Sequence, residues 1–351
     1  DKSSFIVSGR RTYADMFLKF SSDSTINNSK LFFYDLNAKM NFVINEKNTL
    51  FISGYFGRDK LGLNETFGFE WGNTTTTVRW NHLFSNRLFS NTSLIYSDYN
   101  YLIENLMEEN DFKVSSRIRD FNLKQDFQYA LNNHGIKFGL NAIHHTIAPG
   151  KITSSFTSSI NESTIENRKG LELAAYISDE WKASDAITLA YGLRLSSFSL
   201  LGPGTIKDYN ENGEEVNSKI YQSGELVKNY LNLEPRLSAS FQLNDSKSIK
   251  TSYTRNTQNL HLMSNSTASF PTDIYIMSSN NTKPEIADQG ALGYFNNFQN
   301  DNYEFSAEIY YKWMQNQIEY RNGSDLRGNA NVEADLLYGD GRAFGIELFL
   351  K

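Results

Sequence analysis

The sequence contains no cysteine and only five prolines in 351 residues. The absence of cysteine excludes iron–sulfur clusters and cysteine-based zinc sites, and it suits a chain that crosses an oxidising compartment unfolded. No apolar run approaches the roughly 20 residues that a membrane-spanning helix requires, which excludes a helical membrane protein. The 34 basic and 40 acidic residues are interspersed, without the basic stripe that follows a phosphate backbone, so no nucleic acid partner is expected.

What the sequence does have is aromatic residues in a polar chain. It contains 25 Phe and 20 Tyr, yet its mean hydropathy is −0.50. This combination suits a wall with lipid on one side and water on the other.

The pattern of apolar and polar residues has the two-residue period of a β-strand. It is clearest in residues 32–45, where apolar side chains occupy the even positions and mostly polar ones the odd positions. Several further segments alternate over more than ten residues, whereas strands of a soluble sandwich usually have about 5 to 6. The apolar face of the 32–45 segment consists of Phe32, Tyr34, Leu36, Ala38, Met40, Phe42 and Ile44.

Short polar turns and longer connections separate these strands in regular succession. Six turns are expected at 45–48, 85–87, 132–135, 183–185, 244–247 and 296–302, and seven connections near 12–30, 58–68, 99–112, 148–168, 202–229, 256–283 and 323–340. Thirteen connections imply fourteen strands. Outer-membrane barrels have short periplasmic turns and long extracellular loops, so the sequence predicts an all-β, antiparallel transmembrane β-barrel.

Local features refine this prediction. Pro235 interrupts an alternating segment, and we expect a bulge there or disturbed pairing near the outer end of the strand. Residues 87–129 carry charge on both faces, which suggests a short membrane band with strands extending beyond it. Aromatic residues flank the short turns, as expected of rings that prefer the headgroup layer. They are Phe42, Phe84, Phe89, Phe127, Tyr129, Trp181, Phe241, Phe298 and Tyr303.

Several segments, in order along the whole chain, resemble the barrel of TonB-dependent outer-membrane receptors. The similarity is to the group that carries a carboxypeptidase-regulatory-like domain ahead of its plug. The segments that carry it are SFIVSGRRTY (4–13), VRWNH (78–82), EPRLS (234–238), SYTR (252–255), KPEIADQ (283–289) and YGDGRAFGIE (338–347).

The resemblance implies a plug domain followed by a barrel of 22 strands in the cell outer membrane. The present sequence supplies neither plug, nor TonB box, nor the last strands. Residues 1–351 are therefore expected to be an interior portion of one outer-membrane barrel, and a fragment of a larger polypeptide, because unpaired strand edges are not viable in lipid.

The sequence offers little for chemistry. His144 and His145 are adjacent, so on a strand they point to opposite faces and are poor joint ligands for a metal. No Gly-x-Ser-x-Gly nucleophile elbow occurs. We expect no enzyme activity, no metal site and no cofactor.

Candidate binding residues follow from the alternation and the loops. Arg79, Arg194 and Arg236 each oppose an apolar face; in the family reading they face the lumen and hold the plug by charge-assisted hydrogen bonds, and otherwise they line a solvated lumen. Five aromatic residues of the long connections are expected either to grip a ligand or to pack within the loops. They are Tyr101, Tyr209, Phe270, Tyr275 and Tyr338.

The resemblance implies energised uptake of a scarce nutrient, with the chain supplying barrel wall and extracellular loops. The implied partners are outer-membrane lipid, the plug of the same polypeptide, the TonB energy-transducing complex and a surface lipoprotein. Two alternatives stay open: a receptor-like barrel that serves as a scaffold for surface lipoproteins or secretion partners, and a passive porin. The sequence does not identify the ligand.

Overall fold

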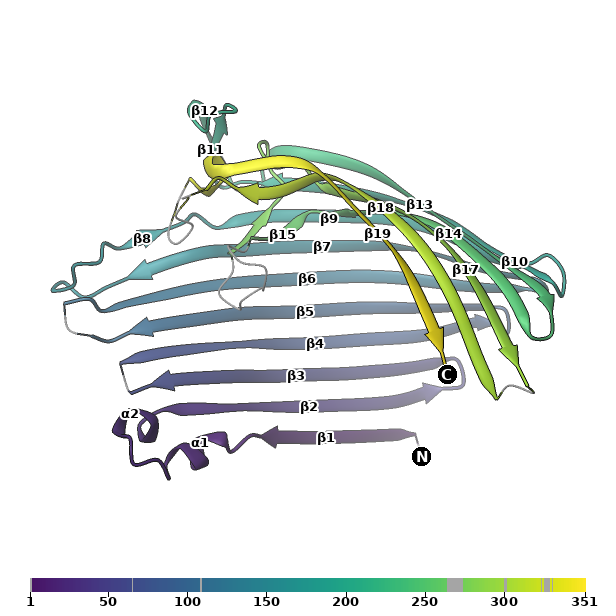
Figure 1. The fold of residues 1–351 in the computed structure, drawn as a ribbon, viewed down its shortest axis with the longest axis horizontal. Coiled ribbons are helices and arrows are strands. Elements are labelled where there is room, and N and C mark those ends of the chain that lie inside the picture. The colour runs from purple at the N-terminus through teal and green to yellow at the C-terminus, as the bar shows by residue number, and fades with distance from the viewer. Residues whose placement is uncertain are drawn as a thin grey trace.

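The computed structural model describes residues 2–64, 66–107, 109–263, 274–299, 302–322, 324, 329 and 331–351. Fourteen strands follow one another in chain order through a single antiparallel sheet, which confirms the predicted strand number (Figure 1). They are β1 (Ser3–Arg11), β2 (Lys30–Asn45), β3 (Asn48–Leu63), β4 (Phe67–Ser85), β5 (Leu88–Asn105), β6 (Phe112–Leu131), β7 (His134–Thr153), β9 (Arg168–Lys182), β10 (Ile187–Leu201), β13 (Leu226–Asn244), β14 (Lys247–Gln258), β17 (Glu285–Phe298), β18 (Tyr303–Tyr320) and β19 (Leu336–Leu350).

The six short turns lie where the sequence predicts them, at one end of the sheet. In the first turn the Asn45 Oδ1 atom accepts hydrogen bonds from the Lys47 backbone amide and the Asn48 side chain, at 3.0 and 2.8 Å. This is the Asx chemistry that closes a tight connection locally.

Two predicted long connections are shorter than expected. Residues 58–68 are mostly strand, because β3 continues to Leu63 and β4 starts at Phe67, and residues 99–112 are mostly strand, because β5 continues to Asn105. The charged residues of the first segment are paired across the ladder: Lys60 Nζ lies 3.2 Å from Glu70 Oε2. Opposite charges on facing strands stabilise a ladder in the same way that apolar pairs do.

The longer connections carry small elements at the other end of the sheet. These are α1 (Ala14–Leu18), α2 (Ser24–Asn27), β8 (Ser163–Thr164), the hairpin of β11 (Gly204–Tyr209) and β12 (Glu215–Tyr221), the hairpin of β15 (Leu260–Met263) and β16 (Ile274–Met277), and the 3-10 helix η1 (Val332–Asp335). Among the described residues, no helix has the length and apolar character needed to span a membrane.

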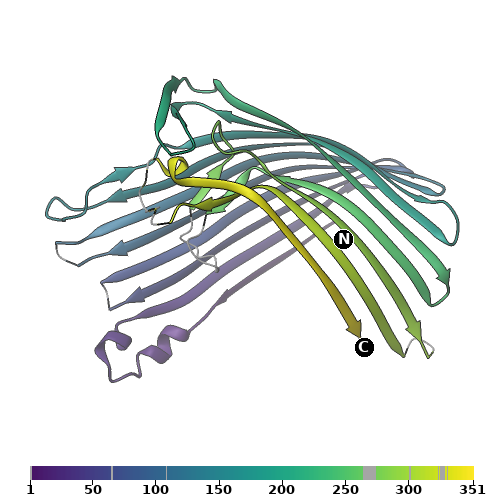
Figure 2. The ribbon, with the colours of Figure 1, turned by 45° about the horizontal axis from the view of Figure 1, so that its top comes forward.

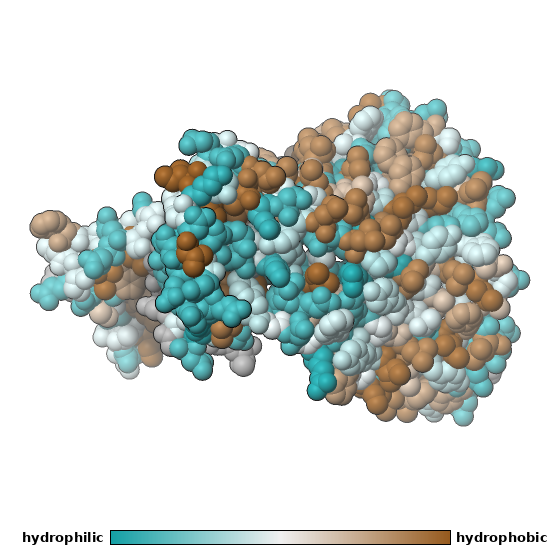
Figure 3. Space-filling view, turned by 90° about the horizontal axis from the view of Figure 1, so that it is seen from above, coloured by the Kyte–Doolittle hydropathy of each residue, from teal (hydrophilic) through white to brown (hydrophobic). Residues whose placement is uncertain are grey.

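The two faces of the sheet differ as the alternation predicts. Val78, Leu94 and Leu123 lie side by side on one face, and Leu94 and Leu123 are 57% and 49% exposed. The neighbouring row on the other face contains Arg79 and Lys124. Seen from above, apolar side chains gather over the strands toward the short-turn end, whereas the long-connection end is mostly polar (Figure 3). We call the first face the apolar face and the second the polar face.

Aromatic rings form a contact chain near the short turns. Trp80, His82, Phe84, Phe127 and Phe138 follow one another with ring centroids 4.3 to 6.4 Å apart. Two of the predicted flanking aromatics, Phe84 and Phe127, belong to this chain. Its position next to the turns is the one that headgroup-level rings occupy in membrane barrels.

Pro235 lies opposite Leu193 in a continuous ladder with β10, so the expected bulge is absent on that side. The pairing of β13 with β14, however, begins only at Arg236, opposite Thr254. A proline has no amide hydrogen to extend a ladder. The alternative expectation, disturbed pairing toward the outer end, is therefore the one found.

The sheet is strongly arched, with β1 and β19 at its two edges (Figures 1 and 2). The arch places the long connections at one mouth and the short turns at the other. What lies on its concave side determines the candidate site.

Candidate functional site

The β15–β16 hairpin lies between two parts of the arch. Successive side chains of β16 point to opposite sides. Tyr275 and Met277 pack against an apolar cluster on β6, β7 and β10. Ile274 and Ile276 pack against the outer ends of β18 and β19 and against η1. A short hairpin can contact strands so far apart in the sheet only from inside its curve. The first cluster, which lies on the polar-face side of the strands, contains Ile118, Ile147, Phe198 and Leu200. The polar face is therefore the concave one.

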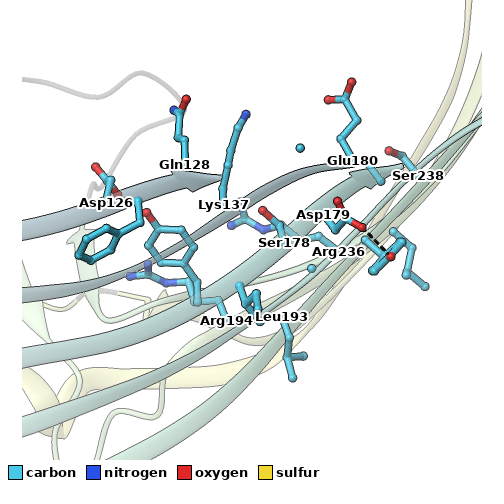
Figure 4. Close-up of a pocket in the computed structure, with 18 of the residues that line it drawn as sticks. Asp126, Gln128, Lys137, Ser178, Asp179, Glu180, Leu193, Arg194, Arg236 and Ser238 are labelled. Atoms are coloured by element: carbon cyan, nitrogen blue, oxygen red, sulfur yellow. Dashed lines mark hydrogen bonds between the residues drawn. The ribbon is translucent and has the colours of Figure 1, made fainter. Parts of the chain in front are cut away.

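Below this hairpin, toward the short turns, the concave face forms a polar groove of about 620 Å³ (Figure 4). Side chains from β6, β7, β9, β10 and β13 reach into it, and charges of both signs alternate along it. Two of the arginines predicted from the sequence, Arg194 and Arg236, line this groove. Its other polar residues include Lys124, Asp126, Gln128, Lys137, Tyr176, Ser178 and Glu180.

A chain of four charged side chains and one histidine crosses five strands at the upper edge of the groove. His145 Nδ1 lies 2.8 Å from Asp120 Oδ1, and His145 Nε2 lies 4.0 Å from Glu172. Arg194 then lies 3.8 Å from Glu172 and 3.9 Å from Glu234. Because each of these side chains has a polar or charged partner on the next strand, the row is fixed in place before any partner binds.

Glu234 anchors one end of this chain. Its side chain is buried, and its Oε1 atom accepts hydrogen bonds from the hydroxyls of Ser196 and Thr257, at 2.6 and 3.0 Å. A buried carboxylate is tolerated only where hydrogen bonds and counter-charges replace its hydration, and here the two neighbouring strands β10 and β14 supply them.

Above the hairpin, toward the long connections, a second cavity of about 370 Å³ opens; we call it the outer cavity. It gathers side chains from the long connections after β7, β10, β14 and β18. Two predicted loop aromatics, Tyr209 and Tyr275, line it beside acidic, basic and amide groups. The polar ones are Glu166, Arg168, Lys207, Asn280, Asn331 and Glu333.

Hydrogen bonds lock the walls of the outer cavity to one another. Tyr209 OH and Lys207 Nζ both donate to Asn331 Oδ1, at 3.1 Å each. Asn281 donates to the Lys207 carbonyl and to Glu333. The β11–β12 hairpin, the segment before β17 and the η1 helix are therefore one connected unit.

Desolvation by the surrounding loops raises the pKa of Glu333 above its ordinary value, although hydrogen bonds from Asn281 and Ser279 act in the opposite direction. Burial likewise raises the pKa of Tyr209. A carboxylate whose charge is disfavoured binds a proton more readily. It can also pair with a cationic group of a ligand that enters the cavity.

The other predicted site residues lie apart. Tyr338 OH is 3.0 Å from the hydroxyl of Thr282, next to the outer cavity. Tyr101 is only 4% exposed and belongs to the strand β5 itself. Arg79 donates to Ser93 on the polar face, at 3.3 Å and outside the groove. Phe270 lies outside the described residues.

Sequence reasoning did not single out Arg168, Lys207 or Glu333. Each comes from a different long connection, and no spacing rule joins positions so far apart in the chain. Their apolar neighbours gave no period either, because each connection contributes only a short segment to the cavity. Only the folded loops bring these groups to one cavity.

The described part of the chain contains no group of three or more His, Asp or Glu side chains placed to hold a metal ion. The two regions have instead the character of binding surfaces, one polar and open, the other mixed and framed by loops.

Comparison with known proteins agrees with this description. Residues 12–351 match the family model described as "TonB dependent receptor-like, beta-barrel". No curated protein sequence matches.

Three solved structures illustrate the likeness of fold. The copper transporter OprC superposes with a TM-score of 0.67 at 13% identity, over 92% of this chain and 52% of that one. The ferric-catecholate import receptor Fiu of E. coli K12 gives 0.62 at 12%, over 99% and 58%. The FrpB iron transporter of Neisseria meningitidis gives 0.63 at 13%, over 91% and 50%. The chain spans about half the length of these proteins.

Proposed function

Because the chain belongs to the TonB-dependent receptor β-barrel family, we propose that it forms wall and outer loops of a receptor for active nutrient uptake. The family consists of outer-membrane transporters, not enzymes. The residues of the groove and of the outer cavity would accordingly bind and guide a ligand without covalent chemistry.

One observation carries the proposal: a ligand-sized outer cavity, lined in part by Tyr275 and Met277 of the β15–β16 hairpin, lies on the same concave side as the polar groove and nearer the long connections. A ligand held by Tyr209, Tyr275 and the polar loop groups would contact this hairpin. Movement of the hairpin would then let the ligand pass toward the groove. Such a two-compartment arrangement suits gated uptake rather than free diffusion.

The groove supports a second part of the proposal, contact with a plug domain of the same polypeptide. Arg194 and Arg236 present guanidinium groups to the concave side, where charge-assisted hydrogen bonds to a polar domain would hold it. The TonB complex would act by pulling on that domain. The chain's own part is to supply a fixed, charge-compensated surface against which the plug can slide.

The edges of the sheet support the inference that further strands complete the barrel. β1 and β19 end the strand order of the described sheet. Both lie among strands whose apolar face is exposed, and unpaired backbone groups are costly in lipid. We therefore place residues 1–351 within a larger barrel, in keeping with the 22-strand architecture that the resemblance implies.

Ligand capture by the native polypeptide tests the proposal. The receptor, extracted in detergent, is incubated with spent growth medium, and the retained small molecules are identified by mass spectrometry. The double variant Tyr209→Ala/Tyr275→Ala should lose the retained compound, whereas the control Tyr303→Ala, at a short turn, should keep it. Equal retention by both variants, or uptake of that compound in cells lacking the TonB complex, contradicts the proposal.

A second candidate role, a platform for a surface lipoprotein, is favoured by the first long connection. There Phe17, within α1, and Phe20, just after it, are 75% and 84% exposed. Exposed rings at an outer loop are suited to a protein contact. Co-purification of a lipoprotein by the native receptor, lost in Phe17→Ser/Phe20→Ser, would support this role, and unchanged co-purification would exclude this surface.

A further inference from the structure

The outer part of the apolar face carries a group of charged residues that transport does not use. Arg58, Lys60, Glu70, Asp98, Arg117 and Arg119 lie on adjacent strands β3 to β6. Their positions have the same parity as the exposed apolar residues Leu94 and Leu123, so they point away from the lumen. We call this group the outer basic cluster.

The distance of the outer basic cluster from the short-turn end, measured along the membrane normal, follows from strand geometry. Asp98 lies about ten residues beyond the short turn at the start of β5, at about 3.4 Å per residue along the strand. With a strand tilt of roughly 40°, this corresponds to a height of about 26 Å, and the apolar band of membrane barrels is about 25 Å tall. The cluster is therefore at the level of the lipid headgroups on the side of the long connections.

An aromatic pair marks the same boundary. The rings of Tyr96 and Phe121 lie 5.0 Å apart on the apolar face, and Tyr96 OH donates to Asp98 Oδ2 at 2.8 Å. At a lipid–water interface, a tyrosine is expected to pack its ring among apolar side chains and to hydrogen-bond its hydroxyl to a polar group on the water side.

Asp98 organises the cations without neutralising them. Its carboxylate accepts from Arg117 Nε at 2.9 Å, and Arg119 Nε lies 3.8 Å away. That Nε atom is buried and has no hydrogen-bond partner. Arg58 is held at 2.7 Å by Asn100. The four cations of the cluster face only two carboxylates, Glu70 and Asp98, which leaves two positive charges.

We propose that the outer basic cluster binds the phosphate of a lipid headgroup in the outer leaflet. The planar guanidinium groups of Arg117 and Arg119 form two-pronged hydrogen bonds to phosphate, and both side chains are partly exposed, at 48% and 38%. The acyl chains of the same lipid would lie on the apolar surface below, over Phe121 and Leu123. A lipid is favoured over free phosphate because the cluster borders the hydrocarbon layer and faces away from the ligand path.

Binding of defined probes to the native polypeptide in detergent tests the proposal. The probes are diphosphoryl lipid A in mixed micelles, the same lipid with its phosphates removed, and inorganic phosphate. Loss of both guanidinium groups in Arg117→Gln/Arg119→Gln should weaken binding of the phosphorylated lipid about tenfold or more. The control Arg87→Gln, which removes one exposed arginine at a short turn, should bind as the unaltered protein does.

The single variant Arg119→Gln keeps the test valid if the double variant fails to fold, because Arg117 then retains its bonds to Asp98. It should weaken binding severalfold. Equal affinity for the dephosphorylated lipid, or equal weakening by Arg87→Gln, overturns the proposal. Tight binding of inorganic phosphate alone assigns the cluster to free phosphate and overturns the lipid assignment.

Discussion

Tyr275, on the β15–β16 hairpin, lies nearly edge-on to Tyr99 of the barrel strand β5, with ring centroids 6.4 Å apart and planes at 71°. The two residues are far apart in the sequence, and this contact ties the hairpin to the inner wall. Edge-to-face ring pairs add about 0.5–1.5 kcal/mol beyond the apolar area that they bury. The hairpin is therefore held by specific packing that a mutation can loosen.

Truncation of the Phe198 side chain should loosen the packing of the β15–β16 hairpin against the barrel wall. This side chain is 1% exposed and packs in the apolar cluster beneath Met277. Phe198→Ala removes a buried ring at a cost of about 3–5 kcal/mol. Faster amide hydrogen exchange in β16 should follow, while exchange in β2 stays the same. The control Phe121→Ala, on the apolar face, should leave β16 protected; loss of protection in both variants would show a general destabilisation.

The outer cavity should loosen as the pH rises, because of Glu333. Desolvation raises the pKa of this carboxyl in the folded loops above its ordinary value of 4.5. The folded state therefore binds the proton more tightly, and this contribution is complete below the ordinary value and lost as the pH rises through the raised one. Tryptic cleavage of the loops should speed up over that range. In Glu333→Gln the pH dependence should be weaker; an unaltered profile would remove Glu333 as its cause.

Removing Glu234, which anchors the chain of side chains that runs from Asp120 to Glu234, should destabilise the barrel. Glu234→Ala leaves Arg194 with one distant partner and the hydroxyls of Ser196 and Thr257 without their acceptor. A loss of about 2–4 kcal/mol is expected, measured as a lower urea midpoint in detergent. Glu180→Ala, an exposed carboxylate of the same groove, should change the midpoint little. A similar shift of the urea midpoint in both variants would mean that the Glu234 interactions add no particular stability.

A charged side chain introduced on the apolar face should destabilise the protein in lipid. Leu195 is 44% exposed, opposite Ala175 on the same face. Leu195→Arg should cost about 2–4 kcal/mol when the protein folds into lipid vesicles, as measured for charges on the lipid face of barrels. Glu180→Arg, on the polar face, should cost less than about 1 kcal/mol. If Glu180→Arg cost more than Leu195→Arg, the polar face would be the one in contact with lipid, which contradicts the assignment of the two faces.

Much of the fold is predictable from the sequence, because a transmembrane strand is a local pattern. The alternation in residues 32–45 and the polar turns fix face, register and strand number without knowledge of the partner strand. The error at 58–68 has a physical cause: charged residues such as Lys60 resemble a loop until the facing Glu70 is placed beside them.

The candidate site is less predictable. Arg194 and Arg236 could be assigned to the polar face from alternation, whereas their shared groove depends on the curvature of the sheet. The β15–β16 hairpin was hidden within the predicted connection 256–283, because each of its strands has only four residues. Glu333 is inconspicuous in the sequence, and only packing of three loops desolvates its carboxyl group.

Labelling of Ser178→Cys in living cells tests most directly whether the concave groove is gated by energy. The substitution introduces a thiol into a chain that has no cysteine, at a position that lines the groove. A water-soluble, membrane-impermeant maleimide is added outside, with and without an uncoupler of the inner membrane. The account predicts labelling in energised cells and little in uncoupled ones. Equal labelling under both conditions would contradict gated uptake and favour a passive pore.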